Sequence, residues 1–263
     1  MCGRYASTRD AADLAAFYDA DSETGDEAIE PNYNVAPTDP VHVVRMSGER
    51  RLVSRARWGL LPPWESDLRA GARMINARAE TAATSRAYRR PFARRRCLVP
   101  ADGWYEWQRP DDGGPVQPYY LTPRHGGVLT FAGLWEIRSA PGSGDAGSSP
   151  RPGAASPGGR MITCTILTTA ALGDLRMVHD RMPLALGEDR WAAWLGADGA
   201  PAPAAEAAEL LRPPGLEWVS EIELRPVGKA VGDVRNNSTA LIQPVTSSIP
   251  GVERAEPVDL TLF

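Results

Sequence analysis

The sequence predicts a single α+β domain in which antiparallel strands dominate. Short apolar or alternating runs recur along the chain, and most are separated by Gly, Pro or Asp, as in strands joined by turns. Helical periodicity is scarce by comparison. A chain of 263 residues that is 43% hydrophobic is long enough to bury a full core, and its length suits one large domain.

The runs expected to form strands lie throughout the chain. They are residues 41–45, 57–60, 97–99, 104–107, 119–121, 129–135, 162–168, 183–186 and 216–219. Three segments show a helical pattern instead. The first has apolar residues at 12, 14, 15, 17 and 18 behind a Ser7-Thr8 cap, and the other two are residues 188–195 and 204–211.

The composition changes abruptly between residues 139 and 160, where fifteen of 22 residues are Gly, Ser or Pro. Such a segment is too polar and flexible to form a core, so we interpret it as a disordered insertion between two strands. Residues 142–147 match the pattern G-x-G-x-x-G. A dinucleotide fingerprint must open a helix, whereas more Ser, Pro and Gly follow here, so we reject a nucleotide site. The domain is expected to span residues 1–250, with a peripheral tail at 251–263.

The cysteines and histidines do not indicate a metal site. Cys2, Cys97 and Cys164 are far apart and form no C-x-x-C pair, and the three histidines are equally scattered. We expect no metal, no other cofactor and no disulfide framework. No apolar run is long enough to span a membrane and the N-terminus lacks a secretory signal, so we expect a cytoplasmic protein.

The charge is unevenly distributed along the chain. The net charge is -4, yet residues 51–96 hold twelve arginines and only three acidic residues, Glu65, Asp67 and Glu80. Phosphate binding requires a local basic surface rather than a basic protein. Lys229 is the only lysine, so a general preference for arginine explains the residue type. It does not explain the clustering, which favours a nucleic-acid contact.

Cys2 follows the initiator methionine directly. If Met1 is removed, the chain begins with an amine and a thiol on adjacent carbons. Such a 1,2-aminothiol captures an aldehyde, first as a Schiff base and then as a five-membered thiazolidine. An α-amine of pKa about 7.7 to 8.0 is roughly a fifth to a third neutral at pH about 7.4, whereas a lysine is only about 0.1% neutral. We expect nearby cations such as Arg4 to lower the pKa of the thiol.

Five short motifs occur in order: residues 1–4 (MCGR), 32–37 (NYNVAP), 76–80 (NARAE), 101–107 (ADGWYEW) and 179–183 (HDRMP). With further matches at 58–59, 80–86 and 231–236, they span nearly the whole chain apart from the insertion and the tail. In this combination the sequence resembles the SRAP family, the SOS-response-associated proteins that process abasic sites in DNA. The resemblance implies an SRAP-like domain with a β-rich, barrel-like core and a few peripheral helices.

The resemblance also implies a reaction. Members of the family bind single-stranded DNA at an abasic site and crosslink its aldehyde through the terminal cysteine. Carried over to this chain, the catalytic residues are Cys2, Asn76, Glu106 and His179. The implied setting is a bacterial-type cytoplasm, at the nucleoid or the replication fork, and we expect a monomer.

The residues themselves leave alternatives open for these roles. The carboxylate of Glu106 lies among Trp104, Tyr105 and Trp107 on an alternating strand, and apolar surroundings would raise its pKa into a useful range. An ion pair with an arginine is the alternative. His179 suits proton transfer, but a histidine beside Asp and Arg is commonly a surface ion-pair member. Asn76 would orient the sugar or the terminal cysteine, or would merely cap a turn.

The resemblance places six further residues in a DNA-binding cleft. Arg4, Arg78 and Arg86 would hold phosphates, which suit the guanidinium fork. Trp64 would stack on a base, or else pack in the core. Asn34 and Thr168 match family positions that line the same cleft.

Two other functions remain open from the sequence. In the first, Cys2, Asn76, Glu106 and His179 form a thiol peptidase that removes the chain's own N-terminal residue or residues. In the second, the protein binds single strands without covalent chemistry and Cys2 is incidental. A Schiff base also permits β-elimination, so weak lyase activity accompanies the crosslinking hypothesis.

Overall fold

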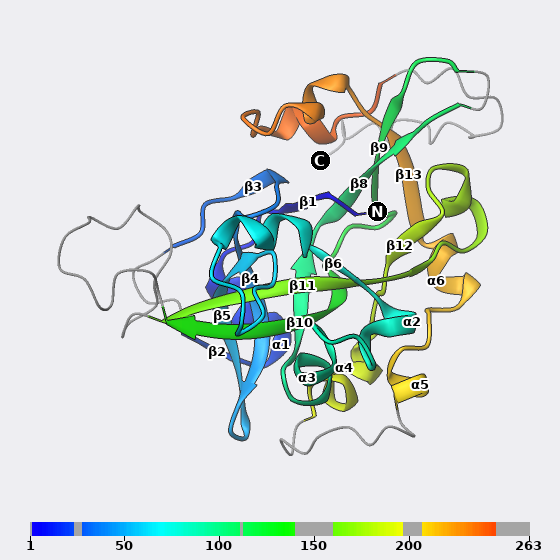
Figure 1. Cartoon of the computed structure of the whole chain (residues 1–263). Coiled ribbons are helices and arrows are strands. Elements are labelled where there is room, and N and C mark those ends of the chain that lie inside the picture. The colour runs from blue at the N-terminus through cyan, green and yellow to red at the C-terminus, as the bar shows by residue number, and fades with distance from the viewer. Residues whose placement is uncertain (1, 24–27, 111–112, 140–159, 197–206, 246–263) are drawn as a thin grey trace.

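The computed structural model describes residues 2–23, 28–110, 113–139, 160–196 and 207–245. Five strands form a closed ring in the order β5, β4, β7, β10 and β11. Neighbours in this order are antiparallel, and the ring closes where β11 pairs in parallel with β5, with Thr163 opposite Arg57. Their bounds are β4 Pro40–Ser47, β5 Arg50–Trp58, β7 Arg96–Ala101, β10 Leu129–Ser139 and β11 Arg160–Ala170. The ring is the barrel (Figure 1).

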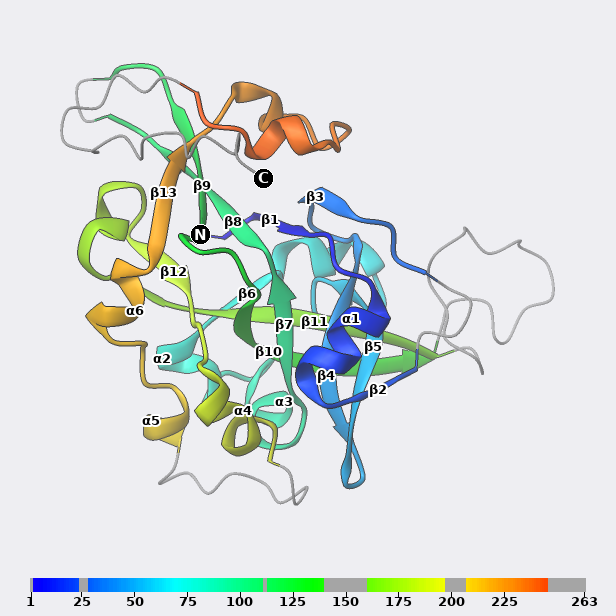
Figure 2. The ribbon, with the colours of Figure 1, turned by 180° about the vertical axis from the view of Figure 1, so that it is seen from behind.

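A second sheet holds the start of the chain, in the strand order β13-β9-β8-β1-β3. Arg4 on β1 is the register partner of Tyr105 on β8. Figures 1 and 2 show β1 between the barrel strands and the orange segment near the C-terminus, and Cys2, just before β1, is fully buried. The bounds are β1 Arg4–Ser7, β3 Asn32–Val35, β8 Gly103–Gln108, β9 Gln117–Pro123 and β13 Ile222–Pro226.

Three short strands extend the barrel. β6, Asn76–Arg78, runs parallel to β11, and β12, Arg181–Pro183, pairs antiparallel with it. Thr168 on β11 is opposite both Arg78 and Pro183. β2, Asp21–Ser22, pairs in parallel with β5. The pairings of β6 and β12 with β11 bring residues about a hundred positions apart to one edge of the barrel.

The largest core cluster packs the second sheet against the barrel. It includes Cys2, Tyr5, Trp58, Trp104 and Phe131, all with exposures of 0%. The ring of Tyr5 meets that of Trp58 edge-on at 5.1 Å, and Trp104 meets Phe131 in the same way at 5.9 Å. Aromatic side chains of this size bury much apolar area each, so the segment that carries Cys2 is firmly anchored.

At two positions, neighbouring atoms lie too close to leave room for any side chain, so the residue must be glycine. At Gly133, a Cβ would lie 2.7 Å from Val99 Cγ2 and 2.9 Å from Cys97 Sγ, so β7 and β10 pack closely only without a side chain there. Gly59 has a φ of +126°, and a Cβ there would lie 2.4 Å from the carbonyl oxygen of Gly71. β5 therefore ends at Trp58, where the chain turns.

The helices are short and lie at the periphery (Figures 1 and 2). Leu14 and Tyr18 of α1 are buried, and the Tyr18 hydroxyl lies 2.7 Å from Thr130 Oγ1 on β10. The α-helices are α1 Ala11–Tyr18, α2 Ala79–Ala82, α3 Arg89–Arg94, α4 Glu188–Leu195, α5 Ala207–Leu210 and α6 Leu216–Ser220. Turns of 3-10 helix are η1 Leu68–Arg73, η2 Gly173–Met177, η4 Lys229–Gly232 and η5 Thr239–Ile242.

The structure confirms the predicted fold class: a single α+β domain with a mainly antiparallel barrel core and peripheral helices. Most of the predicted strands lie within observed ones. The predicted helix at 188–195 is α4, and the described part of 204–211 contains α5.

Some predicted elements are wrong. Residues 216–219 form helix α6 rather than a strand, since they follow Gly215 and bury only Val219. α1 is capped by Asp10, whose carboxylate accepts from the Asp13 amide, and not by Ser7-Thr8. The amide and hydroxyl of Thr8 instead donate to Asp102. Of 183–186, only Pro183 lies in a strand, and the strand predicted at 57–60 stops at Trp58.

Several expectations fall outside the described residues. These are the Gly/Ser/Pro insertion apart from its two ends, the G-x-G-x-x-G segment within it, the tail at 251–263 and the fate of Met1. The strands on either side of the insertion are β10 and β11, as expected. Among the described residues, no helix is long and apolar enough to cross a membrane.

Candidate functional site

Cys2 and Asn76 are in direct contact. The Asn76 side-chain amide donates a hydrogen bond of 2.7 Å to the carbonyl oxygen of Cys2. Asn76 begins β6, and the hydroxyl of Tyr88 donates to the Asn76 carbonyl at 3.3 Å. The Asn76 side chain therefore holds the backbone of Cys2 and does not cap a turn.

The thiol of Cys2 is buried and protonated. Burial raises its pKa well above the usual value, and the charge of Glu106 raises it further. The expectation that Arg4 would lower this pKa is wrong. The guanidinium of Arg4 points away to other partners, and the Arg4 carbonyl is what Cys2 Sγ contacts, at 3.8 Å. The resting thiol is a poor nucleophile, so a base must act on it.

Glu106 lies close enough to Cys2 for its charge to raise the pKa of the thiol. It lies on β8 with an exposure of 3%, between buried Tyr105 and half-buried Trp107. Burial raises its pKa to about 7, and the positive charge at the chain's amino terminus opposes the shift. The apolar environment predicted from the alternating aromatic pattern is confirmed. Near neutral pH this carboxyl group is divided between acid and base forms.

His179 has two alternative partners at one ring nitrogen. Nδ1 lies 2.7 Å from Asp180 Oδ1 and accepts from the backbone amide of Arg181 at 2.9 Å. One nitrogen cannot accept and donate at once, so Nδ1 either accepts from Arg181 or carries a proton and donates to Asp180. Burial lowers the pKa of His179, and the positive amino terminus lowers it further. The neutral ring is thereby favoured near neutral pH.

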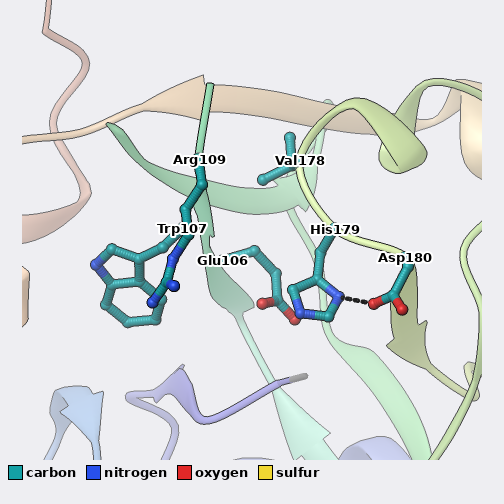
Figure 3. Close-up of a pocket in the computed structure, with 6 residues that line it drawn as sticks. All are labelled: Glu106, Trp107, Arg109, Val178, His179 and Asp180. Atoms are coloured by element: carbon teal, nitrogen blue, oxygen red, sulfur yellow. Dashed lines mark ion pairs between the residues drawn. The ribbon is translucent and has the colours of Figure 1, made fainter. Parts of the chain in front are cut away.

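Glu106 and His179 line one pocket of about 470 Å³. Figure 3 shows the other ring nitrogen of His179 on the side of the Glu106 carboxylate, with Asp180 beyond the ring. The remaining lining residues are Trp107, Arg109, Val178 and Asp180. A carboxyl group of pKa about 7 beside an imidazole suits proton transfer in both directions.

Arg4 and Asn34 hold the segment at 231–236 against the start of the chain. Arg4 donates to Asn34 Oδ1 at 2.7 Å and to the Val231 carbonyl at 3.0 Å. Asn34, only 1% exposed, donates from Nδ2 to the carbonyls of Asp233 and Asn236 at 3.0 Å each. Both side chains are engaged within the protein, so their first role in this structure is to join distant segments.

Arg78 and Thr168 are neighbours across β6 and β11. Thr168 is fully buried, and its carbonyl accepts from Arg181, which also forms a two-point ion pair with Glu80 at 2.7 and 2.9 Å. Arg78 is exposed. Arg78 therefore offers its guanidinium to solvent, whereas Thr168 supports the strand edge from inside.

Trp64 and Arg86 form a pair at the surface. The side chain of Trp64 is 54% exposed, and the Arg86 guanidinium carbon lies 5.0 Å from the centroid of its ring. The alternative that Trp64 packs in the core is excluded. A cation over one face of an exposed ring holds that ring in place for stacking.

The arginine-rich segment is largely a surface. Among the described residues, seven of its arginines are exposed and have no ion pair with an acidic group: Arg69, Arg73, Arg78, Arg86, Arg89, Arg90 and Arg94. Others are internal, such as Arg95, which pairs with buried Glu136. Seven of the twelve arginines of this segment are therefore open to solvent.

Sequence reasoning missed several contributors. Tyr88 supports Asn76 through its hydroxyl, Arg181 bridges Glu80 and Thr168, and Arg109 lines the pocket. Arg109 lies three residues after Glu106, which was a usable signal. The contacts of Tyr88 and Arg181 arise from tertiary structure and left no pattern in the sequence.

Comparisons with known proteins agree with this arrangement. The family model described as SOS response associated peptidase (SRAP) matches residues 1–234. The chain belongs to the SRAP family. It is 31% identical over 249 residues to the abasic site processing protein YedK of Escherichia coli, covering 93% of this chain and 100% of that protein. It is 31% identical over 243 residues to the abasic site processing protein YoqW of Bacillus subtilis, covering 92% and 99%.

Two more distant matches extend the comparison. The abasic site processing protein HMCES of Gallus gallus is 28% identical over 290 residues, which cover 95% of this chain and 80% of that protein. A crystal structure of a Bacteroides thetaiotaomicron protein superposes with a TM-score of 0.74 at 22% identity and covers 93% of this chain. That likeness concerns the fold alone. Among the described residues of this SRAP chain, no group of three or more His, Cys, Asp or Glu is placed to hold a metal.

Proposed function

We propose that this protein binds abasic sites in single-stranded DNA and, once Met1 is removed, crosslinks them through the α-amine and thiol of Cys2. The product is a thiazolidine that shields the lesion during the DNA damage response. The observation that carries the proposal is the hydrogen bond from Asn76 to the Cys2 carbonyl, beside a carboxyl group of pKa about 7. The names of the relatives, abasic site processing proteins, support the same substrate.

The reaction balances without an oxidant or a cofactor. The amine of Cys2 adds to the aldehyde of the ring-opened deoxyribose, and loss of one water gives the imine. The thiol sulfur then bonds to the imine carbon while its proton passes to the nitrogen. The amine acts first, because an α-amine is partly neutral near pH 7 whereas burial keeps the thiol protonated.

Glu106 serves both steps. In its basic form the carboxylate accepts a proton from the adding amine, and in its acidic form it protonates the departing hydroxyl group. It then assists the thiol, whose proton burial holds tightly. Neutral His179 assists opening of the sugar ring and can donate to the sugar oxygen from the nitrogen opposite Asp180.

The DNA strand is held by charge and stacking. Exposed Arg78 and Arg86 bind phosphates, and Trp64 stacks on a base next to the lesion. Such contacts carry little base specificity. Arg4, Asn34 and Thr168 support the cleft from inside through the bonds described above, and we propose that Arg4 also contributes positive charge to it.

The direct test is a denaturing gel of protein mixed with a single-stranded oligonucleotide whose uracil has been excised. A shifted band is expected for the parent and none for Cys2→Ala. If the parent binds the oligonucleotide but never shifts it, the protein is a non-covalent binding module and the proposal fails.

The single lysine sharpens this test. Lys229 and the chain terminus carry the only primary amines in the protein. Trapping with borohydride in a Lys229→Arg variant therefore reports the terminus alone. Cys2→Ser should be trapped as an imine but should form no stable adduct without borohydride. If trapping disappears in Lys229→Arg, the reacting amine is that of Lys229 and the assignment to the chain terminus is wrong.

The family description also names a peptidase, which favours a second activity. In this activity the same four residues remove Met1 from the chain itself. Cys2→Ser and Glu106→Ala proteins made in a purified translation system without aminopeptidase would then retain Met1, whereas the parent would lose it. Retention of Met1 in the parent would refute self-processing. Strand scission at the lesion, trapped by borohydride, tests for lyase activity.

A further inference from the structure

Arg109 lines the pocket but has no part in the chemistry proposed above. It follows β8, three residues after Glu106, and its side chain is exposed. Figure 3 shows the Arg109 side chain among the residues that line the pocket, together with the Glu106 carboxylate and the His179 imidazole.

The donors of Arg109 are available for a ligand. Within the described part of the chain, Arg109 forms no ion pair and its side chain makes no hydrogen bond. Nearby arginines are occupied: Arg181 is bound to Glu80 and Arg4 to Asn34 and the carbonyl of Val231. Arg109 is thus the lining cation of this pocket that is free to bind an anion.

The carboxyl groups of the pocket oppose the binding of DNA, and the positive charge of Arg109 offsets them. Its lining includes two carboxyl groups, Glu106 and Asp180, and the proposed substrate is a polyanion. A phosphodiester that approached these groups without a cation would be repelled. An abasic deoxyribose carries a phosphodiester on each side of the reacting unit, and a guanidinium fork matches two phosphate oxygens at once.

We propose that Arg109 binds one of the two phosphodiesters that flank the abasic deoxyribose and so strengthens binding of the lesion at the pocket lined by Glu106 and His179. This inference rests on the proposed function, since it assumes the same substrate in the same pocket. Arg109 acts through binding and not through proton transfer. Its loss should weaken the encounter with DNA and leave the rate of the chemical step intact.

The first experiment compares Arg109→Gln and Arg109→Lys with the parent in the rate of adduct formation. At subsaturating oligonucleotide, Arg109→Gln should be slower by about tenfold, the loss expected for a charge-assisted hydrogen bond. At saturating oligonucleotide it should match the parent. Arg109→Lys should fall between them because it keeps the charge but loses the fork. Arg50→Gln, which removes an exposed arginine from the β4–β5 hairpin, should behave as the parent.

The second experiment identifies the phosphate. Oligonucleotides carry a neutral methylphosphonate at the linkage 5′ or 3′ to the lesion. When the methylphosphonate is at the linkage that Arg109 contacts, adduct formation by the parent should slow by about the same factor by which Arg109→Gln slows it on native DNA. The parent and Arg109→Gln should then be indistinguishable. At the other linkage their difference should persist. If the difference between parent and variant persists at both linkages, Arg109 contributes only general surface charge and the proposal is overturned.

A third measurement separates this inference from the proposed function. Equilibrium binding of a tetrahydrofuran analogue, which lacks the aldehyde, requires no crosslinking and is measured by fluorescence anisotropy in a Cys2→Ala background. Absence of an adduct in the parent would refute the crosslinking proposal while this binding still tests Arg109. Equal affinities of Arg109→Gln and the parent for the analogue would overturn the role of Arg109. Matching thermal melts would show that the variants fold.

Discussion

Glu106 illustrates how a single buried carboxyl group couples stability to function. Its pKa is about 7 in the folded protein because it is buried, whereas an exposed glutamate titrates near 4.5. Between these values the folded state binds more protons than the unfolded state, so this group's contribution to stability falls as the pH rises. The stabilising contribution is fully present below about pH 4.5 and is lost as the pH passes through 7.

Replacing Glu106 by Gln should therefore stabilise the protein at alkaline pH. We expect a gain on the order of 2 kcal/mol at pH about 8, shrinking towards pH about 5, since the amide has no charge to desolvate. Urea denaturation at the two pH values measures the difference. The same variant should crosslink abasic DNA far more slowly. An unchanged stability at both pH values would mean that Glu106 is not held in a charge-disfavouring environment.

The residue scale also shows what the sequence could and could not predict. The alternation of Trp104, Tyr105 and Trp107 around Glu106 was enough to predict a raised pKa. The pKa of the Cys2 thiol was predicted in the wrong direction, because the direction of the Arg4 side chain and the depth of Cys2 are set by tertiary packing. The contact between Asn76 and Cys2 joins residues 74 positions apart and left no local signal.

At the scale of elements, the side-chain amide of Asn34 joins β3 to the 231–236 segment. Asn34→Ala would leave the carbonyls of Asp233 and Asn236 without their partner and would free the guanidinium of Arg4 from one of its bonds. We expect a loss of about 2 kcal/mol and faster hydrogen exchange at 231–236. Gln243→Ala, which removes an exposed amide, is the control. Equal hydrogen exchange at 231–236 in Asn34→Ala and Gln243→Ala would show that Asn34 does not hold this segment to β3.

The packing of β7 against β10 makes a second prediction for elements. Gly133→Ala would place a methyl group within 3 Å of Val99 Cγ2 and Cys97 Sγ, so the barrel should lose roughly 1–3 kcal/mol or more. Gly228→Ala is the matched control, because a Cβ there meets only Val245 Cγ1 at 4.0 Å. Thermal melts of both variants measure the effect. A neutral Gly133→Ala would show that the two strands are less tightly packed than described.

The positions of the strands along the chain were easier to predict than the pairing of one strand with another. Short apolar or alternating runs identified the cores of β4, β7, β8, β9, β10 and β11, since buried strands require apolar side chains. The closure of the barrel by β11 and β5 was not predictable from the residues alone, because a parallel pairing between segments over a hundred residues apart has no local signature. Residues 216–219 were assigned to a strand from their apolar content, which does not distinguish a short helix from a strand.

At the scale of the whole molecule, we expect exposed arginines to govern the binding of DNA although the net charge of the protein is negative. The net charge is -4, but seven arginines between residues 69 and 94 are exposed. Noncovalent binding of single strands by Cys2→Ala should weaken as salt rises, and each phosphate contact adds about 0.7 to the slope of log K against log salt. Arg78→Gln with Arg86→Gln should lower that slope by about 1.4. An unchanged slope in the double variant would place the DNA elsewhere.

The central claim is that the terminal amine and thiol jointly capture the lesion aldehyde, and intact mass with borohydride tests it most directly. The imine and the thiazolidine have the same mass, namely protein lacking Met1 plus oligonucleotide minus one water, but only the imine takes up two hydrogen atoms from borohydride. We expect the parent adduct to keep its mass after borohydride treatment and the Cys2→Ser adduct to gain two hydrogens. A parent adduct that retains Met1, or that borohydride reduces completely at equilibrium, would contradict the account.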